Sequence, residues 1–302
     1  MKSVLVTGNN GLVGQQVVEA LLNEGYSVTG ISTGKDSKCQ HEMFKYISAD
    51  LTRSTELEKI FRDNEFSHVI HLAAIAHAFK GRNISWSRYY RVNTMMSRQV
   101  FECAISAKIP IFFSSTVDVY GITNGVINEN TEPKPIGPYG RSKYLAEKSL
   151  IGLDKHPYLI ARFAPIYTEG DHHDMHRRYY ISYPKLCYLI GDGMEYEFLY
   201  SKNAVNIILE WIKSPGTLRG IVNVCDAKRY NTKELIKVDK DNGLATMVFR
   251  IPKWLKRLMH ISVNIVFCTN LFLKFTAYKI IFPMRFDSSK LNEILQKISD
   301  NF

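Results

Sequence analysis

The sequence predicts an α/β protein with a doubly wound parallel sheet and a smaller C-terminal lobe. Two observations predict the parallel sheet. A glycine-rich turn directly follows the first strand-like segment, and strands alternate with helical segments through the first half. We therefore place the first domain at residues 1–165, with a late strand at 220–225 that returns to its sheet. The second lobe is expected at residues 166–302.

The first turn predicts a dinucleotide-binding site. The apolar run 4–6 ends in Thr7, and a loop with glycines at 8, 11 and 14 then opens a helical pattern. In such a loop Gly8 permits the tight turn, Gly11 lets the backbone approach a pyrophosphate, and Gly14 lets the helix pack on the strand. The residues expected to contact the cofactor here are Gly8, Asn10, Gly11, Leu12, Val13 and Gly14.

The later elements continue the alternation of strands and helices. We expect strands at 26–32, 44–48, 68–72 and 111–115, helices at 54–63 and 86–107, and a further strand at 158–163. Ligands bind where the parallel strands of such a sheet end. The residues at these ends are Gly8, Ser32, Asp50, Ala73, Thr116 and Arg162.

The end of the second strand bears on the choice between NAD and NADP. An acidic residue usually holds the adenosine ribose of NAD at this position, but here it is Ser32, with Lys35 and Lys38 nearby. A 2′-phosphate would be tolerated, so the sequence leans slightly towards NADP and leaves both cofactors open. Asp50 is expected either to bind the adenine amino group or to cap the helix that follows it.

Tyr139 and Lys143 lie four residues apart on one face of a helix that is expected to start at Pro138. An ammonium about 4 Å from a phenol is worth roughly 4 kcal/mol at an effective dielectric of about 20, which could bring the tyrosine pKa close to neutrality. The spacing alone is weak evidence for an acid–base catalyst, because Tyr144 and Lys148 repeat it.

Several motifs in order carry a family resemblance: the glycine loop, Asp50-Leu51, residues 71–74, Asn93, residues 114–121, and Tyr139 with Lys143. Together they resemble the extended short-chain dehydrogenase/reductases of the NAD-dependent epimerase/dehydratase group, which act on sugar nucleotides. The resemblance is specific over residues 1–167 and looser to about residue 295. It implies a Rossmann domain with a substrate-binding lobe, and it selects Tyr139 over Tyr144.

The resemblance also implies roles for individual residues. Thr116 would hydrogen-bond the substrate oxygen that becomes a carbonyl, Tyr139 would take or give its proton, and Lys143 would lower the tyrosine pKa and hold the nicotinamide ribose. Further cofactor contacts would come from Ser32, Asp50, Leu51, Leu72, Ala73, Ala74, Asn93 and Phe163. Substrate contacts would come from Asp118, Tyr120, Pro165, Arg177 and Arg178.

Departures from the family pattern limit the reactions that this chain is expected to catalyse. Val117 and Asp118 stand where the sugar 4,6-dehydratases of the family have an Asp-Glu pair, so dehydration is not expected. The favoured reading is a nucleotide-sugar epimerase, similar to UDP-sugar 4-epimerases, in surface polysaccharide biosynthesis. The first alternative is an NADPH-dependent 4-keto-sugar-nucleotide reductase, and the second is a non-catalytic dinucleotide-binding scaffold.

One departure concerns the substrate. The family usually has an arginine that grips the nucleotide diphosphate, whereas this chain has Glu-Tyr-Glu-Phe at 195–198. Either Arg177, Arg178 or Lys185 has taken over this role, or the substrate is not a standard nucleoside-diphosphate sugar.

Composition argues against several other classes of protein. The five scattered cysteines argue against a zinc site or a disulfide framework and for a reducing compartment. The N-terminus leaves no room for a signal peptide, so a cytoplasmic protein is expected. The net charge of +10 is not accompanied by a recognised nucleic-acid-binding motif, so no nucleic acid partner is expected.

The C-terminal half leaves three further expectations. Residues 242–286 contain basic and apolar residues but no acidic one; we expect helices of the substrate-binding lobe there, with a helix lying on a membrane surface as the alternative. His172 and His176 have metal-ligand spacing, but the family needs no metal and none is expected. The resemblance leaves the oligomeric state open, with a homodimer through the helix that contains Tyr139 and the helix before it as one expectation.

Overall fold

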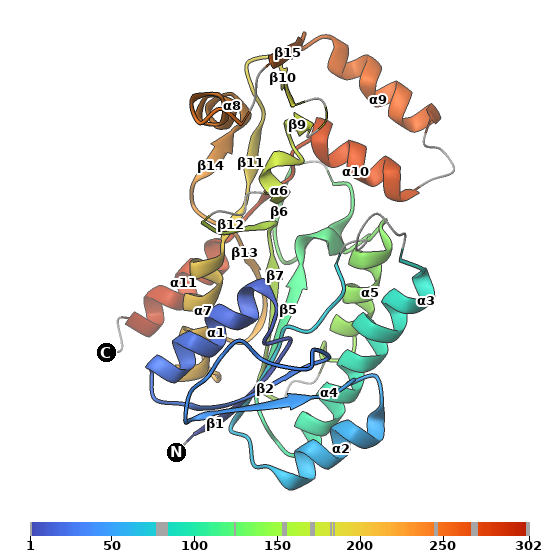
Figure 1. Ribbon diagram of the computed structural model, residues 1–302. Helices are drawn as coiled ribbons and strands as arrows, with labels where there is room; N and C mark the ends of the chain where they lie inside the picture. The colour runs from blue at the N-terminus through green and yellow to red at the C-terminus, as the bar shows by residue number, and fades with distance from the viewer. Residues whose placement is uncertain are drawn as a thin grey trace.

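A seven-stranded parallel sheet forms the centre of the larger lobe (Figure 1). The computed structural model describes residues 2–76, 84–123, 125–152, 156–169, 173–181, 183, 185–244, 247–266 and 271–299. The strand order across the sheet is β13-β7-β5-β4-β1-β2-β3. The strands are β1 (Ser3–Thr7), β2 (Ser27–Ser32), β3 (Phe44–Ser48), β4 (His68–His71), β5 (Ile111–Thr116), β7 (Tyr158–Phe163) and β13 (Gly220–Val224). This order confirms the predicted doubly wound sheet, and β13 is the expected late strand, paired with β7.

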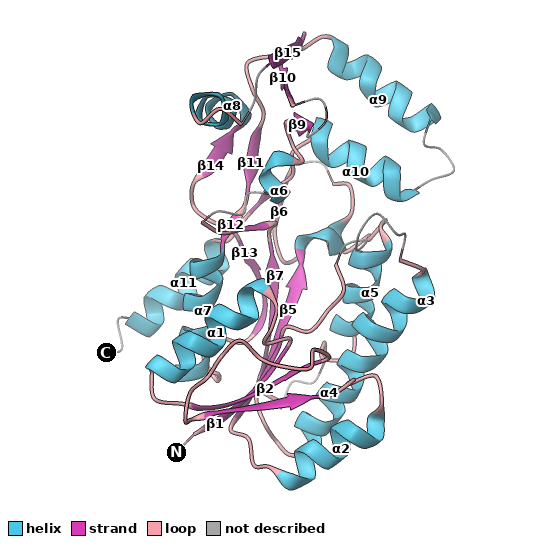
Figure 2. Cartoon of the chain, viewed as in Figure 1, coloured by secondary structure: helices cyan, strands magenta, loops and turns pink. Residues whose placement is uncertain are grey.

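Helices cover both faces of this sheet (Figure 2). On one face lie α1 (Leu12–Asn23), α7 (Ser201–Lys213) and α11 (Ser289–Ser299); on the other lie α2 (Ser54–Asp63), α4 (Met96–Ser106) and α5 (Pro138–Glu147). Each face has its own apolar core, with Trp211 of α7 in the first and Phe101 of α4 in the second. Because both faces of a parallel sheet are covered, its strands are apolar along most of their length.

The helix expected at 86–107 is interrupted. A short helix α3 (Trp86–Tyr89) leads into a π-helical turn at Tyr90–Met95, and α4 follows it. The wider turn carries Asn93 and Thr94, whose side chains both hydrogen-bond to Ser142 on α5, at 3.0 and 2.8 Å. Local sequence does not reveal this turn, because contacts with a helix far along the chain stabilise it.

The rest of the chain forms the smaller lobe, at the top of Figure 1. Its strand groups are β15-β10-β9, β11-β14, β12-β8 and β16-β6. The strands are β6 (Val126–Ile127), β8 (Ile166–Tyr167), β9 (Tyr180–Ile181), β10 (Leu186–Ile190), β11 (Glu195–Glu197), β12 (Leu199–Tyr200), β14 (Arg229–Asn231), β15 (Met247–Ile251) and β16 (Arg285–Phe286). The helices are α6 (His173–His176), α8 (Thr232–Asp241), α9 (Leu255–Val266) and α10 (Leu271–Ile281).

The chain crosses between the lobes several times after residue 165. Helices α7 and α11 and strand β13 all belong to the apolar core on one face of the main sheet. A single boundary at residue 165 therefore does not separate the packed units. Within the described ranges, no helix is long and apolar enough to cross a membrane.

Candidate active site

A cleft of about 350 Å³ opens between the two lobes. The ends of β5 and β7 and the N-terminal turns of α1 and α5 contribute to one side of it, and α10 contributes to the other. The predicted site residues that line the cleft are Gly8, Gly11, Leu12, Val13, Gly14, Leu72, Ala74, Thr116, Asp118, Tyr139, Lys143, Phe163, Pro165, Arg177 and Arg178. The cleft thus lies at the sheet edge where doubly wound folds bind their ligands.

The glycine loop brings the first turn of α1 to the cleft. Gly11 immediately precedes the helix, and Gly14 packs so closely on the loop that a Cβ there would lie 2.2 Å from the Gly8 carbonyl oxygen. Only glycine permits this approach. The first N–H groups of a helix have no partner within the helix, so the start of α1 offers hydrogen-bond donors to an anion such as a pyrophosphate.

Two separate elements bring Thr116 and Tyr139 to the cleft. Thr116 ends β5, and its Oγ1 accepts a hydrogen bond from the Asp118 N–H at 3.2 Å, which leaves the hydroxyl proton available. Tyr139 lies in the first turn of α5, which approaches the end of β5 closely. A Cβ on Gly140 would lie 2.4 Å from the Asp118 carbonyl oxygen. Glycine at position 140 is therefore what allows α5 to start beside Thr116.

Lys143 lies one turn further along α5 and is only 1% exposed. Its Nζ is 4.2 Å from the centroid of the Phe113 ring and has no hydrogen-bond partner in the described part of the chain. Burial lowers the pKa of the ammonium to about 7, and the charge of Glu147 opposes this shift. A buried amine that lines a cleft without an acceptor indicates a ligand that supplies one.

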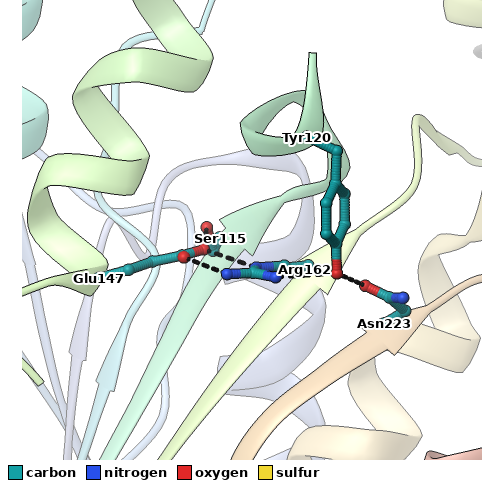
Figure 3. A network of polar contacts seen from close by, with 5 residues as sticks. All are labelled: Ser115, Tyr120, Glu147, Arg162 and Asn223. Atoms are coloured by element: carbon teal, nitrogen blue, oxygen red, sulfur yellow. Dashed lines mark hydrogen bonds and ion pairs between the residues drawn. The ribbon is translucent and has the colours of Figure 1, made fainter. Parts of the chain in front are cut away.

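Glu147, the last residue of α5, forms a buried ion pair with Arg162 of β7 (Figure 3). Arg162 donates from Nε and Nη2 to the two carboxylate oxygens at 3.1 and 2.7 Å, and the Ser115 hydroxyl donates to the same carboxylate. The two side chains are 0% and 2% exposed. The pair ties α5 to the sheet and thereby positions the helix that carries Lys143.

Asn93 holds α5 against the chain that follows β4. Its Nδ2 donates to Ser142 Oγ at 3.0 Å, and its amide exchanges two hydrogen bonds of 2.9 Å with the backbone of Ile75. Ser142 in turn donates to the Tyr139 carbonyl at 2.7 Å. Asn93 was predicted to contact the cofactor, but it is fully buried and does not line the cleft. In the structure it positions the first turn of α5.

The side of the cleft opposite the glycine loop is basic. Lys279 of α10 lies 2.9 and 3.1 Å from the two carboxylate oxygens of Asp118, so this ion pair joins the two lobes. The Arg178 guanidinium lies 5.6 Å from the centroid of the Tyr196 ring, and Arg177 lines the cleft beside it. These cationic side chains could hold a negatively charged substrate.

Residues 4–225 match the family model described as the NAD dependent epimerase/dehydratase family. The chain belongs to this family. A putative UDP-arabinose 4-epimerase of Arabidopsis thaliana is 33% identical over 166 residues, which are 50% of this chain and 38% of that protein. The chain thus aligns with about two fifths of that relative.

Solved structures share the fold of this epimerase/dehydratase chain over nearly its whole length. The UDP-glucuronic acid 4-epimerase of Bacillus cereus, in complex with NAD, has a TM-score of 0.73 and 23% identity, covering 97% of this chain and 92% of that one. The UDP-Glc/GlcNAc 4-epimerase of Campylobacter jejuni has a TM-score of 0.76 and 19% identity, covering 97% and 93%. The predicted family and Rossmann fold are confirmed.

At the end of β2 in this epimerase/dehydratase fold, the neutral side chains of Asn10, Ser32 and Tyr46 form hydrogen bonds with one another. Asn10 Nδ2 donates to Ser32 Oγ at 2.8 Å, and Ser32 Oγ is also hydrogen-bonded to the Tyr46 hydroxyl at 2.9 Å. Neither Asn10 nor Ser32 lines the cleft. Lys35 and Lys38 are exposed.

Three more predicted cofactor residues lie away from the cleft lining. Asp50 accepts hydrogen bonds from the backbone and hydroxyl of Thr52, and these lower the pKa of its carboxyl. Leu51 is 3% exposed and belongs to the core. Ala73 N–H donates to Thr7 Oγ1 at 3.3 Å behind the glycine loop. The structure thus shows Asp50 in the turn before α2, but the N-cap of this helix is Arg53 and no side chain caps it, so Asp50 does not have the expected capping role.

Tyr120 was predicted to contact substrate, and the structure corrects this assignment. Its side chain is 0% exposed and does not line the cleft. Its hydroxyl donates to Asn223 Oδ1 at 2.7 Å and accepts from Arg162 Nη1 at 2.8 Å (Figure 3). The ring therefore belongs to the network that joins β13, β7 and α5, where substrate does not reach it.

Glu197, one of the residues in place of the family's diphosphate-gripping arginine, also has a structural role. Its carboxylate is buried and accepts hydrogen bonds from Arg229 Nε at 3.1 Å and from the Phe286 N–H at 2.6 Å. These bonds join β11 to β14 and β16.

Of the two histidines with metal-ligand spacing, His172 lies outside the described residues. His176 Nε2 lies 3.1 Å from Asp239 Oδ2. Among the residues that the structure describes, no group of three or more His, Cys, Asp or Glu side chains could hold a metal ion.

Sequence reasoning missed the contribution of α10 to the cleft. Phe275, Thr276, Lys279 and Ile280 all line it. No local pattern indicated this, because Lys279 meets Asp118 across 161 residues of chain. Glu147 was missed as well, although its position four residues after Lys143, on the same helical face, was an available signal.

Proposed function

We propose that this chain is an NAD-dependent epimerase that inverts a hydroxyl-bearing carbon of a nucleoside-diphosphate sugar, most simply carbon 4. The observation that carries the proposal is the meeting of Thr116, Tyr139 and buried Lys143, whose Nζ has no hydrogen-bond partner among the described residues, on the cleft that the glycine loop also lines. The 4-epimerase relatives support the choice of reaction. Val117, which lacks the first carboxylate of the dehydratase pair, argues against dehydration.

The cleft residues fit a dinucleotide. The start of α1 and Gly14 suit a pyrophosphate, and Lys143 Nζ, which donates no hydrogen bond within the described part of the chain, suits a ribose hydroxyl. We assign NAD, because the family is described as NAD dependent and the Bacillus cereus structure contains NAD. The slight preference for NADP drawn from Ser32 is not retained. When bound, NAD would supply a reversible hydride acceptor for the reacting carbon.

The chain's own residues handle the proton. Tyr139 would take the proton of the substrate hydroxyl as this group becomes a carbonyl, and return it when the alcohol forms again. Thr116 would donate a hydrogen bond from its hydroxyl to the same substrate oxygen. A protonated Lys143 would stabilise the phenolate by its charge, and burial strengthens this effect because the local dielectric is low.

We assign the diphosphate of the substrate to Arg177 and Arg178. Both line the side of the cleft opposite the glycine loop, and a guanidinium is well suited to a phosphate. Arg178→Met should raise KM for the sugar nucleotide about tenfold or more while leaving NAD binding unchanged. Arg219→Met, at an exposed position outside the cleft, is the control; equal KM values for the two variants would contradict the assignment.

The decisive experiment starts with the purified chain. Any retained nucleotide is identified by absorbance and mass, and the protein is then incubated with a panel of UDP-sugars in D2O. An epimerase retains NAD and incorporates no deuterium at the inverted carbon, because the same hydride returns. Exchange of NADPH with net reduction of a keto sugar would instead identify a reductase, and failure to bind either dinucleotide would exclude both activities.

The role of Tyr139 is tested by Tyr139→Phe. This variant should keep NAD and lose about 10²- to 10⁴-fold in kcat, because the proton has no acceptor. Tyr144→Phe is a matched control on the same helix, where the ring packs against a small apolar cluster around Tyr120. Comparable kcat values for the two variants would show that Tyr139 is not the acid–base group.

A further inference from the structure

The tip of the smaller lobe exposes an unusual number of large apolar side chains. Eight of them lie between residues 247 and 273: Met247, Phe249, Trp254, Leu258, Ile261, Ile265, Val266 and Leu273. We call the first seven, on β15, α9 and their connection, the tip face. Figure 1 shows β15 and α9 at the end of the molecule furthest from the N-terminus. A concentration of this size on a folded domain usually marks an interaction surface.

The exposed residues of α9 form one stripe. Trp254, just before the helix, and Leu258, Ile261 and Ile265 follow one another at intervals of three or four residues, so they lie on the same side. The opposite side contributes Val263, which is buried, and α9 packs against α10. The broad apolar stripe of α9 therefore faces the solvent, whereas the apolar side of an amphipathic helix in a folded domain usually faces the core.

Strand β15, which precedes α9 in the chain, also exposes apolar side chains. Met247 and Phe249 are 65% and 61% exposed, whereas Val248 between them packs against the apolar cluster of Cys187 and Leu189. Alternate side chains of a strand point to opposite faces. The outer face of β15 therefore presents apolar groups, and it leads through Pro252 directly into α9.

The segment that carries the tip face is basic, although two of its cations, Lys279 and Arg285, pair with Asp118 and Glu195. Residues 242–286 contain seven Lys and Arg side chains and no Asp or Glu, out of a net charge of +10 for the whole chain. Without this segment the net charge would be only +3. Arg250 and Lys253 are exposed beside Phe249 and Trp254. An apolar stripe with flanking cations is the composition of helices that lie in the interface of an anionic bilayer.

We propose that the tip face docks on the surface of an anionic lipid bilayer, with α9 lying along the interface. A second copy of the chain fits less well, because a symmetric contact would bring together two surfaces that both carry the exposed cations Arg250 and Lys253. Nucleic acid would leave the aliphatic stripe without a partner. Since α10 packs on α9 and lines the cleft, docking brings the cleft close to the membrane.

The test measures co-sedimentation of the full chain with vesicles. Phosphatidylcholine vesicles containing phosphatidylglycerol should bind the protein at low salt, and pure phosphatidylcholine should bind it much less. About 1 M salt should release it, because the Debye length falls to about 3 Å. Trp254 serves as a reporter: its fluorescence should shift to the blue on binding and be quenched by brominated lipid, whereas fully buried Trp211 should not respond.

Matched variants distinguish docking through the tip face from nonspecific adsorption to vesicles. Ile261→Glu should weaken binding about tenfold or more. Val238→Glu is its control, because Val238 is equally exposed, at 55%, on α8. Lys253→Glu should weaken binding about fivefold or more, since each basic residue near the surface is worth about 1 kcal/mol. Lys59→Glu is the charge control on distant α2.

Several results would overturn the proposal. The first is that the protein does not pellet with anionic vesicles at low salt. The second is that Ile261→Glu and Val238→Glu bind vesicles equally well. The third is that the wild-type chain is a dimer that binds no vesicles and that Ile261→Glu makes it a monomer. Duplex DNA serves as a competitor of the vesicles in the same assay. If DNA displaces the protein from vesicles and Ile261→Glu binds DNA as well as wild type does, the tip face is a nucleic acid surface instead.

Discussion

Replacing Lys143 by methionine should stabilise the protein while abolishing its chemistry. Lys143 is 1% exposed, and burial lowers the pKa of its ammonium from 10.5 to about 7. At about 1.36 kcal/mol per pKa unit, this shift corresponds to a destabilisation of about 5 kcal/mol below about pH 7, where the lysine is protonated in both the folded and the unfolded chain. The Phe113 ring, 4.2 Å from Nζ, offsets about 1 kcal/mol of it.

The effect depends on pH in a defined direction. Unfolded Lys143 holds its proton up to about pH 10.5, whereas the folded side chain releases it above about pH 7. The unfolded state thus binds more protons in this window, so the stability of the wild-type protein rises with pH. Lys143→Met should be more stable than wild type by about 3–4 kcal/mol near pH 7 and by only about 1–2 kcal/mol near pH 9.

The assay is urea unfolding of the nucleotide-free protein at several pH values, followed by circular dichroism. Lys148→Met is the control, because Lys148 is exposed at the end of the same helix and its replacement should change stability by less than about 0.5 kcal/mol. A Lys143→Met variant less stable than wild type near pH 7, or a stability difference that does not change with pH, would refute the reasoning.

Three further predictions concern the same helix. Glu147→Gln leaves the buried Arg162 charge unpaired and should lower the free energy of unfolding by about 3–5 kcal/mol; denaturant titration measures this, and a loss below about 1 kcal/mol would contradict the buried ion pair. Gly140→Ala places a Cβ 2.4 Å from the Asp118 carbonyl oxygen, so α5 must shift, and kcat should fall about 10²-fold even where folding is retained; unchanged kcat would mean that the close approach is not needed. Binding of NAD should raise the pKa of Lys143, because the cofactor gives its ammonium a hydrogen-bond acceptor. Calorimetry near pH 7 in buffers of different ionisation enthalpy should therefore show proton uptake on binding, and Lys143→Met should remove this uptake. Proton release would count against the contact.

Local patterns were sufficient for the larger lobe. The alternation of strands and helices and the glycine loop predicted the parallel sheet, since backbone periodicity and the close packing at Gly14 are encoded within short segments. The expected strands and the helix at 54–63 agree with the structure to within about two residues. The position of Thr116 at the cleft followed from the same logic, because parallel strands all end at one edge of the sheet, whereas the pairing with Tyr139 came from the family resemblance.

Contacts between distant segments were beyond such patterns. The sequence around Tyr120 suggested a substrate contact, but its hydroxyl is used by Asn223, 103 residues away. The helix at 86–107 changes to a π-turn because Asn93 reaches α5. A polar side chain has the same local sequence whether it faces a ligand or a buried partner, so only the folded chain distinguishes the two.

The basic segment at 242–286 shows the same division. Its composition alone predicted helices and left open a membrane-surface role. The tertiary structure decided which side of each helix is buried: α10 turns Lys279 and Phe275 into the cleft, while α9 leaves Leu258 and Ile261 uncovered. Helical periodicity predicts that a helix has an apolar stripe. Whether that stripe is buried depends on the elements that pack against it, and these come from distant parts of the chain.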